Sequence, residues 1–177
     1  MSQQETRRLA LSEWLVLGVI CEQPTHGFAI AALLGTGGDL GRTWRVPKPV
    51  IYRAIARLEK LGLIRTAGEE HSAHGPVRSL LKATPAGRRA AAQWLGTPVE
   101  HARDVRSELM IKLALLDRAG ADPQPLLLAQ RMQLAPIAAA LSDRVRDTAG
   151  FEHTLAVWRH QAMDATMRFL TAMTPLD

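Results

Sequence analysis

The sequence has little cysteine, few aromatic residues and no long hydrophobic run. Cys21 is its one cysteine, so no internal disulfide is possible, and we expect a buried structural thiol in a reducing cytoplasm. The apolar run that ends at Cys21 is far shorter than the roughly 18 to 20 residues that span a bilayer. The first residues also lack the basic start and apolar core of a signal peptide. We therefore expect neither export nor a membrane segment.

The common catalytic signatures are also missing. There is no glycine-rich phosphate loop, no Gly-x-Ser-x-Gly elbow and no His-Glu-x-x-His, and Gly35-Thr36-Gly37-Gly38 does not follow a predicted strand. His71 and His74 have the spacing of metal ligands, but they lie in a predicted glycine-bounded loop without a nearby cysteine. We predict a non-enzymatic chain without metal or cofactor. A metal-dependent protein that uses the two histidines is the alternative.

Positive charge is concentrated in the first half of the chain. Residues 1–98 hold 13 Lys/Arg and 7 Asp/Glu, a balance of +6, whereas residues 99–177 hold 9 and 10, a balance of −1. A random surface bias would give the same sums. However, neutralising phosphates releases condensed counterions, so a basic half joined to a nearly neutral half indicates that one half meets a polyanion. A chain of 177 residues has room for one DNA-reading module and one assembly module.

The order of predicted elements in residues 1–98 is that of a winged helix-turn-helix. Helices are predicted over 9–20, 28–34 and about 49–61, then a strand at 63–65, a polar tip at 68–76, a strand at 77–83 and a helix at about 86–95. Ser12 is the expected cap of the first helix, and Thr84-Pro85 is a strong start for the last one. An inward stripe of Ile51, Ile55 and Leu58 marks the third helix, which in this plan enters the major groove.

Cationic and hydrogen-bonding side chains gather at this third helix and at the wing. Exposed residues there must meet phosphates or base edges in a groove about 12 Å wide. The candidate DNA-binding residues are Arg45, Lys48, Tyr52, Arg53 and Arg57 at the helix, and Arg65, His74 and Arg78 in or beside the wing. Plainer interpretations also exist. Tyr52 is expected to pack beside the wing in one of them, and Arg57 to form a solvated face with Glu59 and Lys60 in another.

Three motifs resemble those of the PadR-like family of bacterial regulators. His26-Gly27-Phe28-Ala29-Ile30 is similar to the family's His-Gly-Tyr-x-Ile, residues 50–64 resemble its recognition helix, and residues 82–88 resemble its strand exit. The resemblance implies a winged-helix transcription repressor in which Tyr52 binds a DNA phosphate and Arg53 or Lys48 lies nearest the groove. The chain departs from the family pattern at Phe28, at Pro47-Lys48-Pro49, and at Leu80 and Leu81 in place of wing aromatics.

The second half is predicted to be helical, over about 102–119, 125–148 and 151–173, with Pro136 kinking or restarting the middle helix. An apolar stripe at spacings of three and four residues runs along the last helix, through Phe151, Leu155, Trp158, Ala162, Ala165, Phe169 and Met173. Exposed apolar seams are costly, so a second copy of the chain is the favoured cover, and an intramolecular core is the alternative. By resemblance, Glu108, Leu109, Ile111, Lys112 and Leu113 support the same interface.

These observations predict a mainly α fold with a small two-stranded β-wing. Residues 1–98 form its DNA-binding domain, and residues 99–177 form a helical dimerisation and possible effector domain. A homodimer would place two recognition helices about one DNA turn apart, roughly 34 Å, on a near-palindromic operator in double-stranded DNA. The resemblance also implies a small aromatic or drug-like effector, at a site that could use Trp14, Trp94, Met110 or Trp158, all of which are also plausible core residues. The alternative is a winged-helix module that binds an acidic protein.

Overall fold

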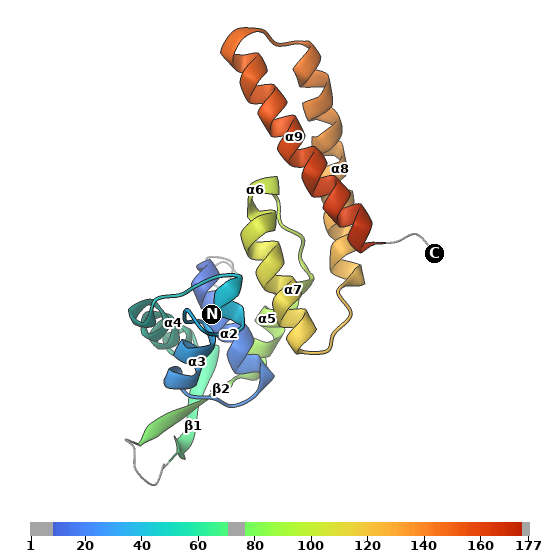
Figure 1. Cartoon of the computed structure of the whole chain (residues 1–177). Helices are drawn as coiled ribbons and strands as arrows, with labels where there is room; N and C mark the ends of the chain where they lie inside the picture. Colours follow the sequence, from blue (N-terminus) through green and yellow to red (C-terminus); the bar gives the residue numbers. More distant parts are fainter. Residues whose placement is uncertain (1–8, 71–76, 175–177) are drawn as a thin grey trace. The chain divides into compact units, whose positions relative to one another are not determined.

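The computed structural model describes residues 9–70 and 77–174. Its contacts divide the chain into two compact units, Met1–Trp94 and Leu95–Asp177 (Figure 1). This division falls slightly before the boundary expected after residue 98, near the end of the last helix of the first unit. The functions assigned to the two halves stay predictions. Below, the first is called the N-terminal unit and the second the helical unit.

The N-terminal unit contains the elements of a winged helix-turn-helix in the predicted order. They are α2 (Leu11–Glu22), α3 (Gly27–Leu33), a 3-10 turn η1 (Leu40–Arg42), α4 (Lys48–Lys60), β1 (Ile64–Glu70), β2 (Arg78–Ala83) and α5 (Pro85–Gly96). The two strands pair antiparallel as a hairpin. The prediction of a mainly α fold with a two-stranded wing is thus confirmed.

Two helix starts show where local sequence signals succeed and fail. The Thr84 hydroxyl accepts a hydrogen bond from the Gly87 amide at 3.1 Å, so α5 begins as predicted. The predicted Ser12 cap of α2 is wrong, because Ser12 lies inside the first turn. The Glu13 carboxylate caps this end instead, and it accepts a hydrogen bond from the Ala10 amide at 2.7 Å.

The hairpin is longer than expected. Ile64 lies opposite Ala83, and pairing continues past an irregularity to Glu70 opposite Arg78, so the polar tip predicted from residue 68 is wrong for residues 68–70. His71 and His74 lie outside the described residues. Leu81 exchanges two backbone hydrogen bonds with Thr25, at 2.7 and 3.0 Å. The turn between α2 and α3 is therefore attached to the wing.

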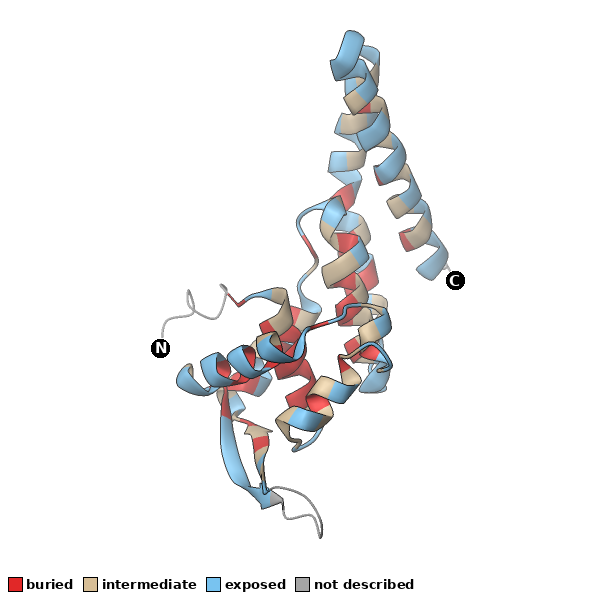
Figure 2. Cartoon of the chain, turned by 60° about the vertical axis from the view of Figure 1, so that its left-hand side comes forward, coloured by how far each residue is buried: buried red, intermediate tan, exposed pale blue. Residues whose placement is uncertain are grey.

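Side chains of α2 and α4 form much of the core of the N-terminal unit. In α2 the fully buried side chains include Leu15, Leu17 and Ile20, and in α4 the predicted inward stripe is buried together with Ala54. The opposite side of α4 is exposed, and Figure 2 shows buried and exposed residues along each element. Cys21 is only half-buried, and this burial raises the pKa of its thiol.

The helical unit contains the three predicted helical segments. Its elements are α6 (Ala102–Asp104), a π-helical turn η2 (Val105–Leu109), α7 (Met110–Arg118), α8 (Gln124–Arg146) and α9 (Gly150–Met173). In Figure 1, α8 and α9 run side by side in opposite directions. Pro136 is exposed inside α8, which continues through it, so this proline does not restart the helix.

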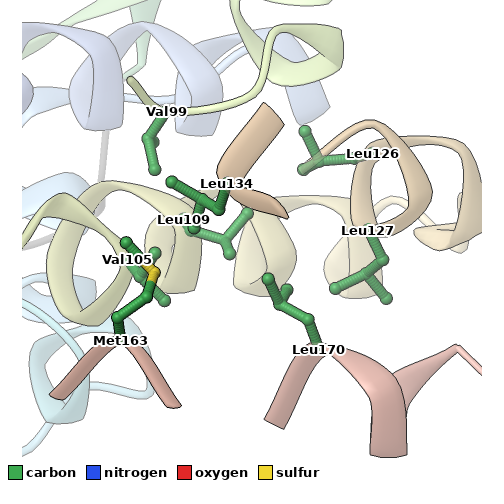
Figure 3. Packing of buried hydrophobic residues seen from close by; sticks show 8 residues of the cluster. All are labelled: Val99, Val105, Leu109, Leu126, Leu127, Leu134, Met163 and Leu170. Carbon is green, nitrogen blue, oxygen red and sulfur yellow. The ribbon is translucent and has the colours of Figure 1, made fainter. Parts of the chain in front are cut away.

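Apolar side chains from all parts of the helical unit form one cluster. Figure 3 shows its members: Val99, Val105, Leu109, Leu126, Leu127, Leu134, Met163 and Leu170. Val99 comes from the segment before α6, so this segment belongs to the core. None of the helices within the described parts of the chain is long and apolar enough to cross a membrane.

Candidate DNA-binding surface

The buried stripe of α4 decides which of its side chains face outward. Ile51, Ile55 and Leu58 form the buried side of α4, and Arg53 lies on the opposite side at 100° per residue. Lys48 shares the side of Ile51, but it is exposed because it stands in the first turn, where α4 begins. Tyr52 is 45% exposed. The structure therefore presents three of the predicted DNA-binding residues on the outside of this helix. Their contact with DNA stays a prediction.

Gly27 explains how Tyr52 fits beside α3. A Cβ atom at Gly27 would lie only 2.9 Å from Cε1 of Tyr52 and 3.3 Å from Cδ1 of Ile55. The glycine therefore lets α4 come close to the start of α3. The Tyr52 ring packs on Gly27 with one edge while the side chain keeps access to solvent. The His-Gly motif thus has a packing role in addition to its helix-start role.

Phe28 brings cationic residues from two other elements together. The Arg78 guanidinium lies 4.9 Å from the centre of the Phe28 ring, and the Lys48 ammonium lies 5.9 Å from it. One nitrogen of His26 accepts a hydrogen bond from the Ala29 amide at 3.0 Å, and the other lies 3.4 Å from the Arg78 guanidinium. The wing and the start of α4 therefore meet at one exposed aromatic ring.

Sequence reasoning recorded Phe28 only as a departure from a family motif. Its partners are 20 and 50 residues further along the chain, so local spacing gives no signal for the cluster (48 − 28 and 78 − 28). Phe28 is 54% exposed, so its ring is open to solvent beside these two cations.

Arg57 differs from the other candidates because it has a partner inside the protein. Its guanidinium lies 3.1 Å from the Glu13 carboxylate, which is buried and also caps α2. Arg57, Glu59 and Lys60 are all exposed, and Glu59 accepts a hydrogen bond from the Thr66 hydroxyl at 3.0 Å, so the alternative of a solvated face stays open. The role of Glu13 was missed, although an acidic residue within an apolar helix was a signal.

The wing carries cations on both strands. Arg65 lies opposite Lys82 in the hairpin register, and Arg78 lies at the start of β2. Like charges directly opposite each other repel, so an anion that approached this pair would relieve the repulsion. Arg45 is exposed just before α4. His74, the remaining wing candidate, lies outside the described residues.

A shallow groove borders this surface. It has a volume of about 280 Å³ and lies between α3 and the segment that leads into α4. Its floor includes Ala31 and Val46, and Phe28, Arg45 and Lys48 also line it. Over the described residues, no three His, Cys, Asp or Glu side chains gather in a way that would hold a metal ion. The alternative based on His71 and His74 falls outside these residues and stays untested.

The predicted stripe on α9 is largely exposed. Phe151 is 78% exposed and Trp158 67%, and Ala162, Ala165 and Met173 are exposed as well, while Leu155 and Phe169 are half-buried. A different face of α9, with Ala156, Met163 and Leu170, packs inside the unit. Figure 2 shows mostly exposed and intermediate residues along the α8–α9 pair. What covers the stripe stays a prediction.

The second group of predicted interface residues is placed differently. Leu109 belongs to the apolar cluster of the helical unit, and Lys112 is buried and bonded within it. Both side chains are thus used inside the unit, and the support that this helix gives to an interface stays a prediction. Of the side chains suggested for an effector, Trp14 and Trp94 stack on each other with centroids 5.1 Å apart and planes 2° from parallel.

A helix-turn-helix with a two-stranded wing and a cationic outer face on its third helix defines the class of winged-helix DNA-binding proteins. Within this class, residues 16–93 match the model of the transcriptional regulator PadR-like family. This match covers most of the N-terminal unit, which is therefore similar to the transcriptional regulators of this family. No curated protein matches the chain.

Several solved structures are similar to the chain at low sequence identity. Bacillus subtilis PadR in complex with operator DNA is 16% identical, with a TM-score of 0.47 over 92% of this chain and 97% of that chain. The same protein in complex with p-coumaric acid is 15% identical, with a TM-score of 0.45 over 93% and 96%. The smu.1604c protein of Streptococcus mutans UA159 is 16% identical, with a TM-score of 0.44 over 91% and 96%.

Proposed function

We propose that the chain is a sequence-specific transcription repressor that binds double-stranded DNA in the cytoplasm. The observation that carries this proposal is the pair of exposed cations on α4. Lys48 lies in its first turn and Arg53 on the side opposite the buried stripe, and neither forms an ion pair within the described residues. Cations left without acidic partners on the helix that a winged helix inserts into DNA are suited to phosphates and base edges.

The surroundings of the candidate residues suit them to different contacts with DNA. Arg53 has the exposed guanidinium that suits a base edge or a phosphate, and Tyr52 can donate its hydroxyl proton to a phosphate oxygen. Lys48 and Arg78 are held beside Phe28, which favours contacts to the backbone from fixed positions. Arg57 contributes mainly through its pairing with Glu13.

Substitution of Arg53 tests this proposal directly. We expect Arg53→Ala to weaken binding to the selected operator by roughly tenfold or more, because one contact to a base or phosphate is typically worth about 1–3 kcal/mol. Arg89→Ala, which removes an equally charged exposed residue from α5, is the matched control and should change affinity less than about twofold. The measurement is a mobility-shift titration at one fixed salt concentration, with duplexes recovered from a random pool.

The outcome also separates DNA binding from protein binding. Operator affinity should fall steeply with salt, and the operator should bind better than random duplex at every salt concentration. Full affinity in Arg53→Ala would remove this residue from the surface. If no duplex bound even at low salt, the chain would fit an acidic protein partner better.

The proposed active form is a homodimer on a near-palindromic operator. The exposed part of the α9 stripe supports this proposal, because five of its seven apolar residues are exposed and such a seam is costly to leave in water. Two recognition helices on one duplex also double the phosphate contacts. Release by a small aromatic effector remains a prediction from the family resemblance, and loss of operator binding in the presence of such a ligand would test it.

A further inference from the structure

The short segment between α5 and α6 is fixed to the helical unit by two buried polar side chains. This segment contains the boundary between residues 1–98 and 99–177 that the sequence predicts. In the structure, the backbone of Thr97 and Val99 is bonded to α7 and α8. The connection therefore has a defined end on the side of the helical unit.

Gln130 of α8 binds both polar backbone groups of Val99. Its amide nitrogen donates to the Val99 carbonyl at 2.9 Å, and its amide oxygen accepts from the Val99 amide at 2.7 Å. Gln130 is 0% exposed. The Val99 side chain points into the apolar cluster towards Leu134 and Leu109 (Figure 3). Breaking this contact would leave buried donors and acceptors without partners, which is costly.

Lys112 of α7 binds the backbone of Thr97, two residues before Val99. Its ammonium group donates to the Thr97 carbonyl at 2.7 Å and lies 2.7 Å from the Glu108 carboxylate in the π-helical turn. The side chain is 1% exposed. Burial lowers the pKa of this lysine even though Glu108 favours its charged form. Burying an ammonium group costs free energy unless it is paired and hydrogen-bonded. The Thr97 carbonyl is one of the partners that make this burial possible, so the position of Thr97 is coupled to α7.

The other side of the connection is fixed within the N-terminal unit. Trp94, near the end of α5, is buried and stacks on Trp14 of α2. Only Leu95 and Gly96, the last two residues of α5, therefore lie between a residue held in one unit and a residue held in the other. A joint this short has little slack, because each helical residue adds only about 1.5 Å of length.

We propose that Gln130 and Lys112 are positioning residues that confine the joint between the units to Leu95 and Gly96, and thereby set the half-site spacing that the dimer accepts. This inference rests on the proposed function, because it requires a dimer that reads two half-sites. One extra base pair moves a half-site by about 3.4 Å along the duplex and turns it by about 36°. Two added residues in the joint would give up to about 7 Å of slack, enough to follow such a shift.

The test compares the spacing preference of full-length variants. The probes are the operator recovered from a random pool and derivatives with one or two base pairs added to or removed from its centre. The variants are Gln130→Leu, which removes both bonds to Val99, and a Gly-Ser insertion after Gly96, which lengthens the joint and leaves both bonds intact. A Gly-Ser insertion after Ala121, an exposed residue of the α7–α8 loop, is the matched control.

For the natural chain and the control, we expect affinity to fall about tenfold or more when two base pairs are added. For Gln130→Leu and the insertion after Gly96, the same change should cost less than about threefold, with dimerisation retained. If Gln130→Leu does not fold, the insertion after Gly96 decides the matter. Equally sharp spacing preferences in all variants would overturn the inference and leave the proposed function intact. A natural chain that bound every spacing equally would instead overturn the proposed dimeric reading, and the inference with it.

Discussion

At the scale of single residues, the His-Gly motif at the start of α3 shows how much function two neighbouring positions can carry. His26 caps α3 with one ring nitrogen and lies close to Arg78 of the wing with the other. Gly27 leaves the space that Tyr52 occupies. The sequence identified this motif by resemblance alone. Its physical reasons depend on residues 26 and 52 positions away from His26, which no local pattern contains (52 − 26 and 78 − 26).

The candidate surface shows the same limit. Exposure of Arg53 followed from the spacing of the buried residues in α4, so it could be predicted from periodicity. Lys48 shares the side of Ile51 and is exposed because it stands in the first turn of the helix. The pairing of Arg57 with Glu13 could not be predicted from periodicity, since the two residues lie 44 positions apart. Sequence predicts which face of a helix is polar. It does not predict which cation on that face is already neutralised by the protein itself.

Lys112 gives a prediction about pH. Burial holds its pKa in the folded chain below the ordinary value of 10.5. Between these two values the unfolded chain binds more protons than the folded chain, so this lysine makes the free energy of unfolding rise as pH increases. Its cost is fully present below the folded-state pKa and disappears above the unfolded-state value. We therefore expect the natural chain to gain stability relative to Lys112→Met as the pH rises from neutral towards the ordinary lysine pKa of 10.5.

Urea unfolding of both proteins at a series of pH values measures this difference, and comparison with Lys112→Met cancels the titration of groups that both chains share. A difference in free energy that stays constant, or that shrinks as pH rises, would contradict the assignment of a buried, charged Lys112.

At the scale of elements, helices were predictable where one face repeats and where a cap is local. The start of α5 at Thr84-Pro85 is an example. The failures occurred where distant contacts decide the outcome. β1 continues to Glu70 because β2 supplies pairing partners for it, although Gly68 is a poor strand former. The π-helical turn at Val105–Leu109 could not be predicted, since a period of 3.6 residues contains no signal for an inserted residue.

Two glycines in α5 give a matched prediction. A Cβ atom on Gly87 would lie 2.0 Å from the Leu63 carbonyl oxygen, so Gly87→Ala must push α5 away from the start of β1. We expect this substitution to lower the free energy of unfolding by about 1–3 kcal/mol or more. Gly96 has no atom within 4 Å of the same position. Gly96→Ala should therefore be neutral or stabilise the chain by up to about 1 kcal/mol.

Chemical denaturation of both variants checks the pair. The two substitutions make the same chemical change in one helix, so helix propensity alone predicts the same sign for both. Equal effects would show that the close approach of α5 to Leu63 is not tight enough to matter.

At the scale of the whole molecule, the charge balance predicted that the basic half meets a polyanion and the nearly neutral half does not. The two compact units agree with the expectation of two modules, although the function of each stays a prediction. The sequence could not decide whether the α9 stripe is covered by the chain's own core or by a second copy of the chain. A spacing of three and four residues fits an internal seam and a partner's seam equally well. In the structure the internal seam uses other residues of α9, including Met163 and Leu170.

Because the α9 stripe is largely exposed in the single chain, a substitution on it should be able to break the dimer without unfolding the chain. Trp158 is 67% exposed in the single chain, so Trp158→Glu should cost the fold little, while a charge at the centre of an apolar interface should break the dimer. Thr171, exposed and about 140° around α9 from Trp158 at 100° per residue, provides Thr171→Glu as a control with the same new charge. Sedimentation should show a monomer for Trp158→Glu alone. Operator affinity should then fall by about 10²-fold or more, because the second half-site is no longer bound by a linked copy, while weak binding to a single half-site persists. A Trp158→Glu chain that sedimented as a dimer and bound the operator normally would show that another surface joins the two copies.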